Sequence, residues 1–151
     1  MHQNIFEMRK FLKISIIFGV VLTTFFVVSC NRKLDNQIII NTPINFRIYP
    51  NSLEYQDLNV TGGFMYLNGE GDSYGIIVYR SQPEEFRAYD RKPFYNEKCP
   101  NNRLYVKLPL IIDECNNYEY LILDGYNVNG DGTHIYWYKT EYDGTELRIY
   151  N

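Results

Sequence analysis

The side chains of this sequence that could do acid–base chemistry are spaced so that they cannot act together. Two adjacent acidic pairs, Glu84-Glu85 and Asp113-Glu114, lie next to segments with strand character. Neighbouring side chains on a strand point to opposite faces, so neither pair can share a proton or flank one scissile bond. Both pairs are expected to be solvated, and His134, a histidine without a nearby catalytic partner, is expected at the surface or on an edge strand. No G-x-S-x-G motif or phosphate-binding loop occurs, so the chain is not expected to be an enzyme.

One segment carries the oxygen ligands with which a calcium loop begins. Asn127, Asn129 and Asp131 alternate along the chain and Gly132 follows them, as in that type of loop. The twelfth position is Tyr138 in place of the bidentate glutamate, and no helical pattern flanks the segment. A tight turn rich in Asn and Gly is therefore the preferred interpretation, and no metal site is predicted.

The N-terminal segment predicts export and a lipid anchor. Basic residues over 9–13 precede an uncharged run over 14–28, and Val27-Val28-Ser29-Cys30 ends that run. This order is typical of a bacterial lipoprotein signal, and the last four residues resemble a lipobox with Val27 in place of the usual Leu. We expect cleavage before Cys30, acylation of its thiol, and attachment to the lipid bilayer. The alternative is an uncleaved anchor helix, although the run is shorter than the roughly 20 residues of a typical span.

These features divide the chain into three parts. Residues 1–29 are the predicted signal peptide, 30–43 the lipidated cysteine with a tether, and 44–151 a single domain of suitable size. Loss of the signal lowers the formal charge from −3 to −5, because it removes three basic residues and one acidic residue. No concentrated basic face remains, which excludes nucleic acid as a partner. No acidic run follows Cys30, which favours the outer membrane of a bacterial envelope, facing the periplasm.

Two cysteines remain for the exported domain once Cys30 is acylated. Cys99 and Cys115 are an even number in a compartment where disulfides persist. A bond between them would stabilise the fold by about 3 kcal/mol in the chain-entropy model. Two buried thiols, or one thiol with another role, are the alternatives.

The domain is predicted to be all-β. Alternating or continuous apolar residues indicate short strands at 44–49, 64–67, 75–80, 86–89, 104–106, 110–112, 118–123, 136–142 and 145–150. The last two flank Asp143-Gly144, a strong signal for a short hairpin. Fifteen Tyr and nine Phe agree with this class, because aromatic side chains pack well on pleated surfaces. No sustained helical period follows Cys30.

The order of several short motifs resembles a Rieske-type domain. These motifs are GIIVYR at 75–80, FRAYDR at 86–91, Cys115-x-x-Tyr118, LILDG at 121–125 and GTELRI at 144–149. The resemblance covers about residues 44–151 and is to bacterial lipoproteins with a Rieske-like fold and degenerate cluster loops. It implies an antiparallel β-sandwich or barrel of short strands.

The same resemblance implies that the cluster of a Rieske domain is missing. Such a domain holds a [2Fe–2S] cluster with two Cys on one iron and two His on the other, from a Cys-x-His and a Cys-x-x-His loop. At the matching positions this sequence has Lys92 and Phe94, then Cys115 and Tyr118. After the signal, His134 is its one histidine, so the two imidazole ligands cannot be supplied. We therefore expect no cofactor.

The resemblance also implies what fills the former cluster site. Phe94, Tyr95 and Tyr118 are expected to form an aromatic plug, and a Cys99–Cys115 bond would join the two loops. The predicted function is non-catalytic binding or scaffolding of an envelope protein or glycan by a membrane-anchored lipoprotein. A carbohydrate-binding module is the first alternative, because aromatic faces stack on sugar rings and tyrosines are abundant. Rieske-type electron transfer is the second alternative. It is disfavoured because the sequence lacks the full set of histidine and cysteine ligands of the cluster.

Overall fold

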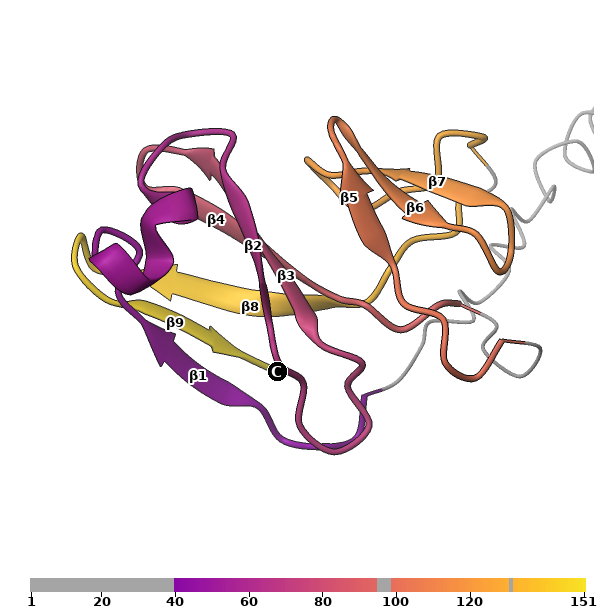
Figure 1. The fold of residues 1–151 in the computed structure, drawn as a ribbon, viewed down its shortest axis with the longest axis horizontal. Helices are drawn as coiled ribbons and strands as arrows, with labels where there is room; N and C mark the ends of the chain where they lie inside the picture. Colours follow the sequence, from indigo (N-terminus) through magenta and orange to yellow (C-terminus); the bar gives the residue numbers. More distant parts are fainter. Residues whose placement is uncertain (1–39, 95–98, 131) are drawn as a thin grey trace, which may run out of the picture. The chain divides into compact units, whose positions relative to one another are not determined.

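The computed structural model describes residues 40–94, 99–130 and 132–151 and is all-β, as predicted (Figure 1). The predicted signal peptide, Cys30 and most of the tether lie outside these ranges. Six strands form one antiparallel sheet in the order β1 (Asn45–Ile48), β9 (Leu147–Tyr150), β8 (Trp137–Tyr142), β4 (Glu85–Asp90), β3 (Ile76–Gln82) and β2 (Phe64–Leu67). A second antiparallel sheet contains β5 (Tyr105–Lys107), β6 (Leu110–Asp113) and β7 (Tyr118–Leu121). No helix in the described ranges is long and apolar enough to cross a membrane.

The small sheet is an insertion into the large one. β4 and β8 are neighbours in the large sheet, yet the whole of β5–β7 lies between them in the chain. The register between β4 and β8 is short and pairs Ala88 with Tyr138 and Tyr89 with Trp137. Beyond the second pair the chain leaves β4 for the small sheet, and it returns at the start of β8. The two sheets therefore meet where this short ladder ends.

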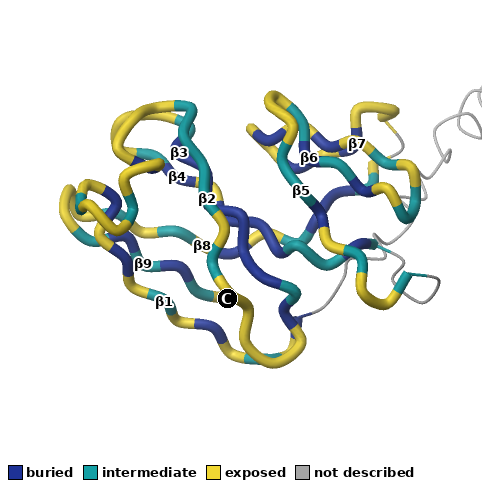
Figure 2. The backbone as a smooth tube through the Cα atoms, viewed as in Figure 1, coloured by how far each residue is buried: buried dark blue, intermediate teal, exposed yellow. Residues whose placement is uncertain are grey.

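β3 separates two hydrophobic cores, which explains its continuous apolar sequence. Ile76 and Val78 belong to a core with β1, β8 and β9, whereas Ile77 and Tyr79 belong to a second core with the small sheet. A strand buried on both faces lacks the alternation of a half-exposed strand. Figure 2 shows buried residues along most of β3 and β4.

A short 3₁₀-helix, η2 (Leu53–Leu58), was not predicted. It buries Leu58 completely but leaves Leu53 exposed, so it has no apolar period long enough to be recognised. The Arg80 guanidinium fixes its end on the sheet, because Nη1 donates to the Leu58 carbonyl at 2.9 Å and to Asn51 Oδ1 at 3.0 Å.

The predicted hairpin at Asp143-Gly144 exists, but its loop is longer than two residues. The register pairs Tyr142 with Leu147, so β9 begins two residues later than expected. Asp143 Oδ1 accepts hydrogen bonds from the amides of Thr145 at 2.8 Å and Glu146 at 2.7 Å. These bonds hold both residues in the turn and lower the pKa of the Asp143 carboxyl.

Candidate functional site

Cys99 and Cys115 form a disulfide, with their Cα atoms 6.0 Å apart. The bond joins the segment before β5 to the turn between β6 and β7. Of the alternatives left open by the sequence, the disulfide is therefore confirmed. Neither sulfur is available as a thiolate ligand while this bond is intact.

The expectation that Asp113 is solvated was wrong. Its side chain has no exposed surface. The carboxylate accepts hydrogen bonds from the Cys115 amide at 3.0 Å, the Asn116 amide at 3.2 Å and the Asn116 side chain at 2.7 Å. Asp113 thus organises the β6–β7 turn that holds Cys115. The Asp113-Glu114 sequence alone does not indicate this role.

The positions assigned to cluster ligands do not form a [2Fe–2S] site. Cys115 is in the disulfide, and the Lys92 ammonium lies 5.7 Å from the centre of the Tyr74 ring. Tyr118 packs edge-on against Tyr120, at 6.1 Å between ring centres. Phe94 is half-buried, and its predicted partner in the aromatic plug, Tyr95, lies outside the described residues. A disulfide, an ammonium and two aromatic rings do not fit the ligand set that the cluster requires.

The calcium-like segment is a tight turn across the part that is described. Asn127 Oδ1 accepts the Asn129 amide at 3.0 Å, and the Asn127 carbonyl accepts the Gly130 amide at 3.1 Å. The Asn127 side chain is buried and stabilises the turn. Asp131 lies outside the described residues.

His134 is buried, so of its two predicted positions, at the surface or on an edge strand, the surface position is wrong. It is 4% exposed and pairs with Tyr126 in an isolated β-bridge. Its Nδ1 lies 3.0 Å from the Ile135 carbonyl oxygen, and its ring stacks on Trp137, at 4.6 Å between centres and 28° between planes. A polar ring can be buried here because its nitrogen has a backbone partner and its face has an aromatic one.

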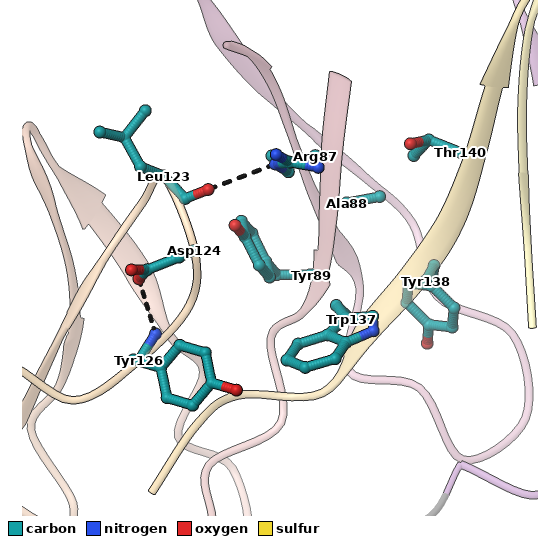
Figure 3. Close-up of a pocket in the computed structure, with 9 residues that line it drawn as sticks. All are labelled: Arg87, Ala88, Tyr89, Leu123, Asp124, Tyr126, Trp137, Tyr138 and Thr140. Atoms are coloured by element: carbon teal, nitrogen blue, oxygen red, sulfur yellow. Dashed lines mark hydrogen bonds between the residues drawn. The ribbon is translucent and has the colours of Figure 1, made fainter. Parts of the chain in front are cut away.

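A pocket of about 240 Å³ lies beside this histidine, where the β4–β8 ladder ends (Figure 3). Its walls come from three segments: residues 87–89 of β4, the turn over 123–126, and β8 from Trp137 to Thr140. The turn belongs to the chain returning from the small sheet. The pocket is therefore made by the junction of the two sheets.

Two exposed rings form the aromatic side of the pocket. Trp137 is 42% exposed and Tyr126 is 44% exposed. Their ring centres are 6.3 Å apart and their planes are tilted by 56°. Side chains alternate along β8, so the inward position of the buried Tyr138 places Trp137 on the outer face.

Two charged side chains of opposite sign also line the pocket. Arg87 Nε donates to the Leu123 carbonyl at 3.3 Å and its guanidinium pairs with Glu85, which holds Arg87 across β4 and the turn. Asp124 Oδ1 accepts the Tyr126 amide at 3.0 Å, which orients the turn. Figure 3 shows Arg87 at the opposite end of the pocket from the Tyr126 and Trp137 rings.

Tyr89 lines the base of the pocket, between the charged side chains and the two exposed rings. Its hydroxyl donates to the Ile122 carbonyl at 2.9 Å, and burial raises the pKa of this phenol above its usual value near 10. Gly125 has φ of +75°, and a Cβ there would lie 2.8 Å from Tyr89 Cε1. Only glycine lets the turn pass this close to the tyrosine ring.

Comparison with protein-family models, curated proteins and solved structures gives no match to this chain. The site must therefore be interpreted from its own geometry.

The pocket was not predicted from the sequence. Its residues come from three distant segments and most of them also fit a strand pattern. The available signal was Trp137, the only tryptophan, at an outward position of an alternating strand.

Proposed function

We propose that this chain is a lipid-anchored protein of the bacterial envelope whose β domain binds a ligand, without catalysis, in the Trp137 pocket. The observation that carries the binding function is the exposure of the Trp137 and Tyr126 rings in a concave site. Large aromatic side chains are usually withdrawn from water, and a concave cluster of them with a few polar groups is typical of ligand sites.

The topology supports a Rieske-like domain. A small three-stranded sheet interrupts a larger sheet, and its two loops are joined by Cys99–Cys115. In the resembled family these two loops hold the cluster. Here a disulfide and the Asp113 hydrogen bonds stabilise the same region. We therefore propose a Rieske-like fold that lacks the redox centre. Electron transfer is disfavoured because the matching side chains do not suit iron.

The anchor is tested by the mass of the mature N terminus. The lipoprotein proposal expects a chain beginning at a diacylglyceryl-modified Cys30, and expects Cys30→Ala to abolish that modification. An intact Met1, or an unmodified Cys30, would show that the chain is not a processed lipoprotein.

The binding function is tested through the fluorescence of Trp137. Because Trp137 is the only tryptophan, any change in its emission reports on this pocket. The probes are envelope glycan fragments, envelope peptides and phospholipid headgroups, each titrated separately. At least one class should shift the emission of the wild type and of Tyr49→Ala, but not of Tyr126→Ala. Tyr49 is a suitable control because it is 50% exposed and does not line the pocket. If no class shifts the wild type, the pocket is not a binding site for envelope components.

A further inference from the structure

We infer that the Trp137 pocket binds one ring of a neutral sugar, stacked on the open face of the indole. This inference rests on the proposed binding function and specifies its ligand. Three properties of the site support it: the orientation of the indole, the signs of the nearby charges and the size of the pocket.

The indole offers a single flat face. The ring of His134 stacks against Trp137 at 4.6 Å, and His134 is itself 4% exposed. Since that face is covered, the exposed part of Trp137 belongs to its other face and edge. Tyr126, tilted by 56°, lies beside it as a side wall. A ligand that uses this surface best is itself flat and presents C–H groups over a ring-sized area.

The charges favour a ligand without net charge. Arg87 and Asp124 both line the pocket and have opposite signs, so an anion meets one like charge and so does a cation. Hydroxyl groups, in contrast, can accept from a guanidinium and donate to a carboxylate. Thr140 adds an acceptor, because its hydroxyl already donates to the Phe86 carbonyl at 2.9 Å. An apolar face with hydroxyls around its edge describes a neutral sugar ring.

The rings do not form an aromatic cage for a cation. Such a cage needs several exposed ring faces around one point. Tyr89 is 1% exposed, and its hydroxyl donates a hydrogen bond to a backbone carbonyl. The exposed rings of the site are therefore those of Trp137 and Tyr126. Arg87 also faces this space. The competing hypothesis is that the pocket binds a quaternary ammonium group, and the experiment below tests it with choline.

The volume limits how much of a ligand can enter. About 240 Å³ is below the range of roughly 300–1,000 Å³ for sites that enclose drug-sized ligands. The site therefore suits one ring, with the remainder of an oligosaccharide outside the pocket. Affinity should depend mainly on one stacked residue and little on chain length.

The experiment is calorimetric titration of short neutral oligosaccharides of glucose, galactose, mannose and N-acetylglucosamine, with choline as the competing probe. At least one sugar should bind the wild type, and Trp137→Ala should weaken it by roughly tenfold or more. Arg87→Met and Asp124→Asn should each weaken binding severalfold, whereas Tyr49→Ala should bind as the wild type does. Circular dichroism of every variant checks that it is folded.

The outcomes separate this inference from the binding function. If envelope peptides or headgroups shift Trp137 emission and no sugar binds, the sugar assignment is wrong and the binding function stands. Tighter binding of choline than of any sugar also overturns the assignment. If no probe of either experiment binds, both proposals fail. Sugar binding that survives in a folded Trp137→Ala variant places the sugar elsewhere and overturns the stacking inference.

Discussion

At the scale of single residues, buried polar groups in this domain are satisfied by a few specific donors. The carboxylate of Asp90 has no exposed surface and accepts three hydrogen bonds. The Tyr138 hydroxyl donates at 2.5 Å, the Lys92 amide at 2.7 Å and the Tyr74 amide at 3.2 Å. Asp90 therefore links β4, β8 and the two loops that leave β4 and enter β3.

Tyr138→Phe should destabilise the fold by about 1–3 kcal/mol. The substitution keeps the ring in the core but removes the donor to a buried carboxylate, and hydrogen bonds to charged groups are worth about that much. Urea unfolding measures the change. Tyr136→Phe is the matched control, because its ring contacts Tyr138 edge-on at 5.1 Å and no hydrogen bond of its hydroxyl occurs among the described residues. Equal stability of both variants would show that the Asp90 bond contributes little.

Gly125→Ala should cost more stability than Gly130→Ala. Both glycines have positive φ, +75° and +71°, so each alanine costs about 1–2 kcal/mol of backbone strain. At Gly125 the added Cβ also meets Tyr89 at 2.8 Å and Ile135 at 3.1 Å, whereas at Gly130 it meets open space. The additional cost should be about 1–3 kcal/mol, as in other overpacked sites. Equal unfolding free energies would contradict the close approach of the turn to Tyr89.

At the scale of elements, the sequence predicted the strands well and the turns less well. Alternating or continuous apolar residues indicated each of the nine strands in the described ranges, because burial of one face repeats every second residue and burial of both faces gives an unbroken apolar run. Turn lengths were less accurate, since side-chain hydrogen bonds such as those of Asp143 decide them. The helix η2 was missed because its stability comes from Leu58 and from Arg80, which is distant in the sequence. Asp113 and His134 were misplaced although their hydrogen-bond partners lie only one to three residues away, because their burial depends on how the surrounding chain packs.

The disulfide should be the main stabiliser of the small sheet. Cys99 and Cys115 are 16 residues apart in the sequence, and closing a loop of that size is worth about 3 kcal/mol. Cys99→Ser/Cys115→Ser should lower the unfolding free energy by about that amount, and hydrogen exchange should accelerate in β5–β7 more than in β1 and β9. The wild type treated with reductant should match the double variant. An unchanged melting temperature would show that the bond adds no stability.

At the scale of the whole molecule, the candidate site arises from topology that no local pattern contains. Strand periodicity does not determine that β4 pairs with β8 across an inserted sheet, yet this pairing brings Arg87, Asp124 and Trp137 together. In the sequence, Tyr89, Trp137 and Tyr138 fit a strand pattern, and they form a concave site with Tyr126 because the chain returns past Gly125. The fold class was therefore predictable from composition and period, whereas the pocket depended on long-range contacts.

Global stability should fall as the pH rises above about 10. Burial raises the pKa of Tyr89 and Tyr138 above the usual value near 10, and the hydrogen bond to Asp90 contributes further at Tyr138. Above the unfolded pKa the unfolded chain loses these protons while the folded chain retains them, so stability decreases with pH until the folded pKa values are reached. Below pH 10 both states are protonated, and the two phenols cause no pH dependence. Urea midpoints measured from neutral pH upward test this directly. Tyr89→Phe/Tyr138→Phe should start less stable but lose less on alkalinisation, and an equal loss would show that these two phenols are not responsible.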